Sequence, residues 1–216
     1  MKKIVAINAS PRTSWNTATL IREAAKGAAS EGAETEIIDL YKLGNFTGCI
    51  SCFGCKREPN IGKCICKDEL AYVLEAIRNA DGVIIGSPVY IGNLTAAFRA
   101  LYERLIFQYI TYKTEPKSYS KSNIPVLLVI TSNAPEESFD KTGYNALFED
   151  YRRSLNHFIG PAKTLVYSNT LQVNDYEKYD WTMFDVESKK SYNEKALPQK
   201  KQEAFDLGKR MLTEEW

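Results

Sequence analysis

The sequence predicts an α/β fold in which a five-stranded parallel sheet of order 2-1-3-4-5 carries helices on both faces, in three layers. Strand and helix patterns alternate five times along the 216 residues. That alternation is typical of parallel sheets built by right-handed crossovers. The run GVIIGS at 82–87 is apolar throughout, as expected of a strand covered on both faces. No internal repeat or linker interrupts the pattern, so we expect a single domain over 1–216.

The first half of the chain supplies two strands and two helices. KKIVAIN at 2–8 is a short apolar strand, and apolar residues at helical spacing predict a helix over 17–30. ETEIIDL at 34–40 is the second strand. A loop rich in Gly and Cys covers 44–67, and a helix with its apolar residues on one face is expected over 68–80.

The middle of the chain repeats this alternation. The third strand at 82–87 leads into a helix over about 93–108, which a polar excursion follows at 111–123. IPVLLVIT at 124–131 is the fourth strand, again apolar enough to be buried on both faces. The spacing then predicts a helix over 144–158.

The last part of the chain is less regular. A short fifth strand is expected over 163–167. The stretch 175–196 is charged and aromatic without clear periodicity, so we expect irregular structure there. A terminal helix is predicted over 198–212, with Pro198 near its first turn, where proline is tolerated.

Composition excludes several classes of protein. Lys and Arg number 28, Asp and Glu 27, so the net charge of +1 indicates neither nucleic acid nor a membrane surface as a partner. No apolar run approaches the roughly 20 residues that span a bilayer. The first apolar run ends at Asn8 and passes directly into a loop, unlike a signal peptide. We therefore expect a cytoplasmic protein.

The loop after the first strand fits a phosphate monoester. Where a strand's carboxyl end leads into a helix, backbone N–H groups are free and the helix dipole adds positive potential. Short polar side chains and one permanent charge occupy this loop: Ser10, Ser14, Asn16, Thr17 and Arg12. The loop lacks the Gly-rich dinucleotide pattern and the GK[ST] ending of NTPases. The alternative is an ordinary capped helix start, with Asn16 or Thr17 as the N-cap.

The loop after the third strand is expected to face the phosphate loop across one crevice. In a sheet of order 2-1-3-4-5, the first and third strands flank the switch point, and ligands bind beyond their carboxyl ends. Pro88 fixes the backbone, Tyr90 offers an aromatic surface to a flat ring, and Gly92 permits an unusual turn. The alternative is a rigid turn in which Asn93 caps the next helix.

Together, the stretches NASPRTSWNTATL and GSPVYIGNLTAAFRALYERL resemble the NADPH-dependent FMN reductase and multimeric flavodoxin family. The resemblance covers about residues 1–170 and implies a flavodoxin-like fold that binds FMN. Three groups of residues are implied as contacts. They are Ser10, Arg12, Ser14, Asn16 and Thr17 for the phosphate, Pro88, Val89, Tyr90, Gly92 and Asn93 for the isoalloxazine ring, and Thr131, Ser132 and Asn133 for the flavin edge.

All five cysteines lie between Cys49 and Cys66, unlike the disulfide framework of a small secreted domain. Cys49, Cys52 and Cys55 form C-x2-C-x2-C, and Cys64 follows. Thiolates spaced in this way can curl around a cubane, and four thiolates also suit zinc. Redox-active thiols, a labile disulfide and inert loop cysteines are the alternatives that the spacing leaves open.

The cysteine run, followed by Lys67-Asp68-Glu69, also resembles the iron–sulfur flavoprotein branch of the same family. That resemblance implies a [4Fe–4S] cluster next to the flavin. Its ligands would be Cys49, Cys52, Cys55 and Cys64. Cys66 would be the spare thiol, or the fourth ligand in place of Cys64.

Two functions follow from these features. The first is an oxidoreductase in which FMN accepts a hydride from NAD(P)H and passes electrons to a quinone, free flavin or other small acceptor. The second is an electron carrier in which FMN and a [4Fe–4S] cluster exchange single electrons with a ferredoxin-like partner, in a homodimer or homotetramer. A regulatory module that binds a ligand without redox turnover is a third class. We assign no general acid or base.

Overall fold

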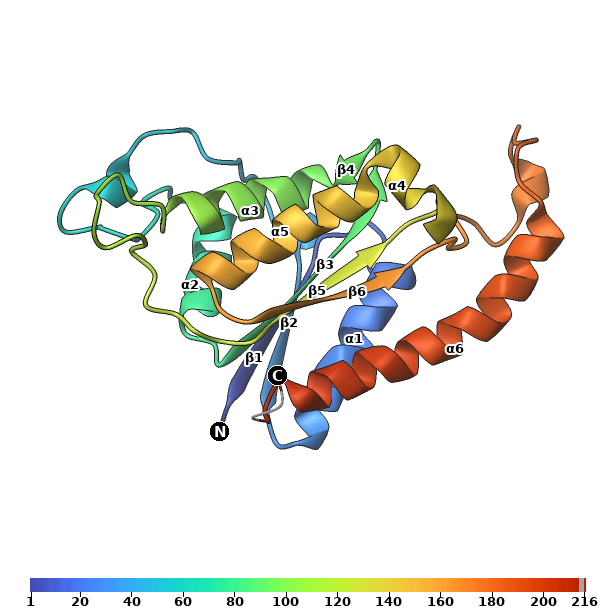
Figure 1. Cartoon of the computed structure of the whole chain (residues 1–216), viewed down its shortest axis with the longest axis horizontal. Helices are drawn as coiled ribbons and strands as arrows, with labels where there is room; N and C mark the ends of the chain where they lie inside the picture. Colours follow the sequence, from blue (N-terminus) through green and yellow to red (C-terminus); the bar gives the residue numbers. More distant parts are fainter. Residues whose placement is uncertain (214–215) are drawn as a thin grey trace.

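A single mixed sheet forms the centre of the computed structural model, which describes residues 1–213 and 216 (Figure 1). Its parallel part has the order β2-β1-β3-β5-β6, and the short strand β4 pairs antiparallel with β3. The bounds are Lys3–Asn8 for β1, Glu34–Asp39 for β2, Gly82–Tyr90 for β3, Asn93–Leu94 for β4, Val126–Thr131 for β5 and Ala162–Tyr167 for β6. Counting only the parallel strands, this is the predicted 2-1-3-4-5 order, so the fold class is confirmed.

Helices cover both faces of the sheet, as Figure 1 shows. One face is packed by α1 and α6, and the other by α2, α3 and α5. The bounds are Asn16–Ser30 for α1, Glu69–Arg78 for α2, Ala96–Phe107 for α3, Phe139–Thr142 for the short α4, Tyr144–Phe158 for α5 and Val186–Arg210 for α6. Short 3-10 turns lie at Leu40–Lys42, Gly54–Lys56, Glu136–Ser138 and Tyr176–Lys178.

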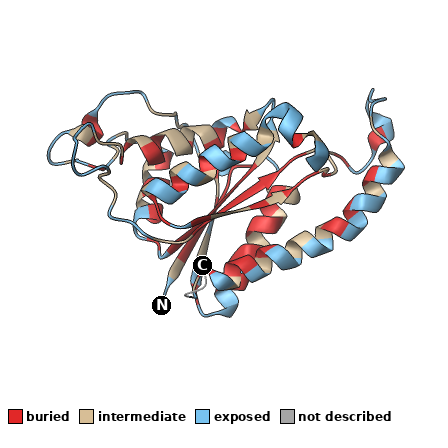
Figure 2. Ribbon diagram, in the orientation of Figure 1, coloured by how far each residue is buried: buried red, intermediate tan, exposed pale blue. Residues whose placement is uncertain are grey.

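The strands β1, β3, β5 and β6 contribute side chains to both halves of the core, because successive side chains of a strand point to opposite faces. Ile4 and Ala6 pack with the α1 and α6 layer, whereas Val5 and Ile7 pack with the other helices. Figure 2 shows the sheet as the most continuously buried part of the molecule. Burial on both faces explains why the central strands are apolar along most of their length, with the polar residues Asn8, Ser87 and Thr131 toward their carboxyl ends.

The terminal helix is longer than predicted. It begins at Val186, so Pro198 lies inside it and not in its first turn. Asp185 caps its start by accepting a hydrogen bond from the Ser188 N–H at 3.0 Å. The periodicity was obscured because Lys189 and Asn193, one turn apart, occupy its buried face. Both side chains are polar, and both form hydrogen bonds with residues outside the helix.

The third strand also continues beyond its predicted end. It runs to Tyr90, and a two-residue turn at Ile91 and Gly92 returns the chain as β4. Both turn residues have positive φ, 48° and 76°, which matches the hairpin turns that follow the twist of a sheet. Helix α3 therefore starts at Ala96, and its cap is Thr95, whose Oγ1 accepts from the Phe98 N–H at 3.2 Å.

None of the helices in the described residues is long and apolar enough to cross a bilayer.

Candidate functional site

A cleft of about 370 Å³ lies at the carboxyl edge of β1, β3 and β5. Ligand pockets for small molecules fall in the range of roughly 300–1,000 Å³. The β1–α1 loop and the end of β3 form two of its walls, so the two loops singled out in the sequence share one cleft. The predicted contacts that line it are Ser10, Arg12, Asn16, Thr17, Pro88, Val89, Tyr90, Thr131 and Asn133.

Local hydrogen bonds fix the conformation of the β1–α1 loop. The Ser10 N–H donates to Asn8 Oδ1 at 3.0 Å, and the Arg12 N–H donates to Ser10 Oγ at 3.1 Å. The residue at the N-cap of α1 is Trp15, not Asn16 or Thr17, and it makes no side-chain cap hydrogen bond. The capped-start alternative is therefore not what the structure shows. The amino end of α1 faces the cleft without a side-chain cap, as an anion site requires.

The segment after β6 closes the cleft over this loop. Leu171 O accepts hydrogen bonds from Trp15 Nε1 at 3.1 Å and from Asn16 Nδ2 at 2.9 Å, and the Arg12 guanidinium donates to Gln172 O. Thr170, Leu171, Gln172 and Trp181 line this side of the cleft. The sequence did not predict this wall, because nothing in the local pattern of residues 170–172 indicates that this segment contacts the β1–α1 loop.

A pair of threonines forms the floor between the sheet and α1. Thr17 Oγ1 and Thr131 Oγ1 lie 2.7 Å apart, and both residues are buried. Ser132 is also buried but does not line the cleft. Its Oγ accepts from the Ala134 N–H at 3.1 Å and so shapes the turn after β5. Ser14, at the other end of the site, is exposed and outside the cleft.

The end of β3 is tied to the β1–α1 loop through Thr95. The Thr95 hydroxyl donates to Ala9 O at 2.7 Å, and its N–H donates to Ser87 Oγ at 3.0 Å. This holds the end of β3 beside the β1–α1 loop, where Tyr90 stays 44% exposed. Gly92 and Asn93 lie in the hairpin, away from the cleft lining, and Asn93 Oδ1 accepts from Tyr151 OH at 2.6 Å.

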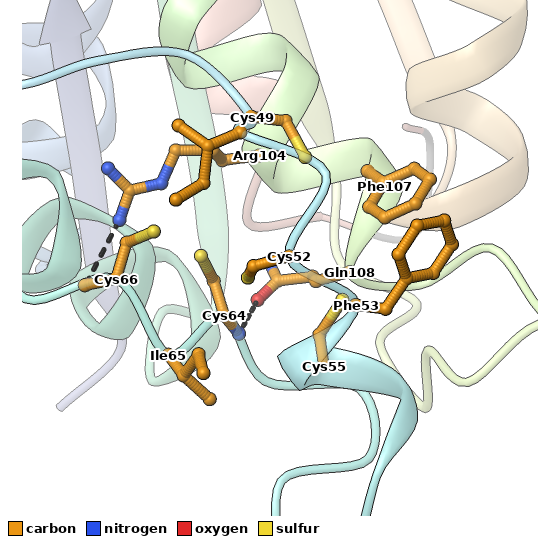
Figure 3. Close-up of a pocket in the computed structure, with 11 residues that line it drawn as sticks. Cys49, Cys52, Phe53, Cys55, Cys64, Ile65, Cys66, Arg104, Phe107 and Gln108 are labelled. Atoms are coloured by element: carbon orange, nitrogen blue, oxygen red, sulfur yellow. Dashed lines mark hydrogen bonds between the residues drawn. The ribbon is translucent and has the colours of Figure 1, made fainter.

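A second pocket gathers all five cysteines between the 49–66 loop and α3 (Figure 3). In Figure 3 the thiols of the loop face Arg104 and Phe107 of α3 and Gln108, the residue that follows the helix. Spacing along the chain indicated the cysteines but not these three partners, which only the packing of the loop on the helix brings in. Every cysteine is a free thiol.

Polar side chains of α3 and of Gln108, directly after it, orient the cysteine loop. Gln108 Oε1 accepts from the Cys64 N–H at 3.1 Å, and Glu103 Oε2 accepts from the Cys49 N–H at 3.3 Å. Arg104 Nη2 donates to Cys66 O at 3.2 Å. These contacts fix the loop's backbone and leave the thiols pointing into the pocket.

Burial and neighbouring groups shift the pKa values of Cys55, Cys66 and Arg104 in this pocket. Burial raises the pKa of the Cys55 and Cys66 thiols, with the neighbouring Cys64 adding to the effect at both. For Arg104, burial by itself would lower the pKa, but Asp68 and Cys64 outweigh it and raise that pKa. The guanidinium is therefore a fixed cation in this pocket, and burial disfavours the thiolate form of Cys55 and Cys66.

Within the described residues, no three His, Cys, Asp or Glu side chains form a group that could hold a metal ion. The four ligands of a cubane bind four different iron atoms and therefore lie farther apart than the ligands of one ion.

A family model described as NADPH-dependent FMN reductase matches residues 2–136. An iron–sulfur flavoprotein of Methanocaldococcus jannaschii is 42% identical over 102 residues, which are 47% of this chain and 51% of the relative. An iron–sulfur flavoprotein of Clostridioides difficile is 33% identical over 104 residues, 47% of this chain and 44% of the relative. The matches thus span about half the length of these relatives.

Solved structures share the fold at low sequence identity. The NAD(P)H:quinone oxidoreductase from Methanothermobacter marburgensis superposes with a TM-score of 0.70 and 14% identity, over 97% of this chain and 98% of that one. An azoreductase from Bacillus anthracis superposes with a TM-score of 0.67 and 15% identity, over 97% and 100% of the two chains.

Proposed function

Because the chain belongs to the NADPH-dependent FMN reductase family, we propose that it is an FMN-dependent oxidoreductase that uses NAD(P)H as a transient donor. One observation carries the proposal: the β1–α1 loop and the end of β3 line a single cleft at the switch point of the sheet. A quinone, a free flavin or a similar small molecule would be the acceptor, and the free thiols suit a cytoplasmic protein.

The residues present fit FMN. The amino end of α1 has no side-chain cap, and Arg12 lies beside it, so this end of the cleft suits a phosphate. Ser10, Asn16 and Thr17 would add hydrogen bonds to the phosphate. Pro88, Val89 and Tyr90 would lie along the ring, with Thr131 and Asn133 at its edge.

FMN supplies hydride acceptance from NAD(P)H and onward electron transfer. The chain supplies position and charge stabilisation. Backbone N–H groups at the end of β3 and in the turn after it would donate to the polar edge of the ring and favour its reduced form. Ser14, Ser132, Gly92 and Asn93 would act indirectly, by shaping the loops that line the cleft.

The phosphate site is tested by comparing FMN with riboflavin in fluorescence titrations of the purified protein. In Arg12→Ala, a lost charge-assisted hydrogen bond of about 1.5–3 kcal/mol should weaken FMN binding roughly 10- to 100-fold and leave riboflavin binding nearly unchanged. Arg153→Ala is the matched control, because Arg153 is a surface residue of α5 paired with Asp150. Equal wild-type affinity for FMN and riboflavin would refute the site.

The cysteine pocket supports a second function, an iron–sulfur flavoprotein that exchanges single electrons with a ferredoxin-like partner. All five thiols line one pocket, and Arg104 Nε is buried there without a hydrogen-bond acceptor. Thiolates bind iron, and an orphaned N–H donor suits an anionic group, so the residues fit a [4Fe–4S] cluster. Cys49, Cys52, Cys55 and Cys64 would hold it, with Cys66 in reserve. The cluster supplies one-electron transfer.

Anaerobic purification with flavin, iron and sulfide measured together separates the two functions. Four iron and four sulfide per chain, retained in Cys66→Ser and lost in Cys55→Ser, would support the carrier. A flavin spectrum bleached by NADPH in protein without iron would support the reductase alone. Light scattering on the same sample would test the proposed homodimer or homotetramer.

A further inference from the structure

Arg104 is the most deeply buried charged side chain of the cysteine pocket. It rises from α3, and its side chain is 0% exposed. The pocket around it is otherwise lined by the thiols, apolar side chains and Gln108. A guanidinium in such surroundings is stable only when its N–H groups find acceptors.

Two of the three guanidinium nitrogens, Nη1 and Nη2, have hydrogen-bond acceptors. Nη1 donates to the two carboxylate oxygens of Asp68 at 2.6 and 2.7 Å, and Nη2 donates to Cys66 O at 3.2 Å. Asp68 is itself fixed, because its Oδ1 also caps α2 by accepting from the Leu70 N–H at 3.1 Å. The ion pair therefore holds the guanidinium in one orientation.

The remaining donor, Nε–H, has no acceptor among the described residues. A buried donor without an acceptor is unfavourable, because it has lost its hydrogen bonds to water. Cys64 and Arg104 both line this pocket, and Cys64, together with Asp68, raises the pKa of Arg104. A neutral thiol is a weak acceptor, whereas a thiolate sulfur accepts a charge-assisted hydrogen bond.

We propose that Arg104 Nε–H donates a hydrogen bond to the Cys64 sulfur when that cysteine ligates the cluster, and that this bond raises the cluster's reduction potential. Hydrogen bonds to ligand sulfurs favour the reduced, more negative state of a cluster. The Asp68 carboxylate balances the positive charge of Arg104. The change in reduction potential therefore comes mainly from the hydrogen bond that Nε–H donates to the sulfur, and less from the charge of the guanidinium. The inference rests on the second proposed function.

The test is Arg104→Lys, which keeps the charge and removes the Nε–H donor. Cluster and flavin potentials are measured by anaerobic redox titration, with iron and sulfide measured on the same samples. At a poise where half of the wild-type cluster is reduced, we expect the reduced-to-oxidised ratio in the variant to fall about tenfold, equivalent to 59 mV for one electron. The flavin potential should stay unchanged. Arg152→Lys, a surface change on α5 beside Glu149, is the matched control.

Two outcomes separate the inference from the function on which it depends. Wild-type protein without iron and sulfide overturns the second function and the role of Arg104 with it. Loaded wild type and Arg104→Lys with equal cluster potentials overturn only the role of Arg104.

If the variant does not fold or load, pulsed EPR on reduced wild-type protein with 15N-labelled arginine decides the question. A 15N coupling to the cluster supports the hydrogen bond, and its absence overturns it.

Discussion

Lys189 is a buried lysine whose partners in the described part of the chain are neutral oxygens. It is 5% exposed, and its Nζ donates to Asn133 O at 3.1 Å and to Asn169 Oδ1 at 2.6 Å. Burial lowers the pKa of Lys189 to about 8. Because Asn133 lines the cleft, this lysine supports the loop after β5 from behind.

This depressed pKa predicts a dependence of stability on pH. Between pH 8 and about 10.5 the unfolded chain holds a proton on Lys189 that the folded chain has lost, so the free energy of unfolding rises with pH in this window. From pH 8 to pH 9.5 the gain is about 1.5 kcal/mol. Urea denaturation at both pH values should show this gain in wild type and lose it in Lys189→Met.

Lys190→Met is the control at the residue scale, since Lys190 lies on the exposed side of the same helix and pairs with Glu187. It should keep the wild-type pH dependence. A stability difference between wild type and Lys189→Met that is the same at both pH values would contradict the assignment.

At the scale of elements, α1 and α6 cross with their backbones in contact. A Cβ built on Gly208 would lie 1.9 Å from Ala24 O, and one built on Gly27 would lie 2.0 Å from Phe205 O. Each helix therefore contributes a glycine that no larger residue can replace without a shift of the pair. This contact seats the long terminal helix against the sheet face formed with Ile4 and Ala6.

Gly208→Ala should destabilise the protein, although alanine favours an isolated helix by about 1 kcal/mol over glycine. The overlap with α1 forces the helices apart, which costs about 1–3 kcal/mol of unfolding free energy. Thermal unfolding measures the change. Gly44→Ala is the control, because its Cβ would meet only Glu69 Cγ, at an ordinary 3.6 Å. A Gly208→Ala variant as stable as the control would show that α6 can move at no cost.

At the scale of the whole molecule, the cleft joins segments that are far apart in the chain. The β1–α1 loop, the end of β3, the turn after β5 and the 170–172 segment meet there. A ligand that contacts all of them binds only the folded state, so it must raise the melting temperature.

FMN at 100 times its dissociation constant should add about 2.7 kcal/mol to the unfolding free energy. For a chain of this size that raises Tm by about 5–10 °C. Differential scanning fluorimetry with FMN, riboflavin and inorganic phosphate measures the effect, and FMN should give the largest shift at equal concentration. Equal shifts with FMN and riboflavin would argue against a phosphate contact.

Sequence alone determined the sheet and its switch point. A strand buried on both faces must be apolar at every position, so 82–87 and 124–131 were recognisable without knowing their neighbours. Strand order then brings the loops at Arg12 and Tyr90 to one edge, and both line the cleft. These predictions succeeded because they rest on local periodicity and on the handedness of crossovers.

Only the tertiary structure decided which polar residues are buried. In the sequence Arg104 looks like an ordinary helical surface residue, and Lys189 lies in a stretch without clear periodicity. Each becomes buried when a distant segment folds over it. The 170–172 wall and the first half of α6 were missed for the same reason. A buried polar side chain is stable when its hydrogen-bond partners come from far along the chain, and local periodicity carries no record of those partners.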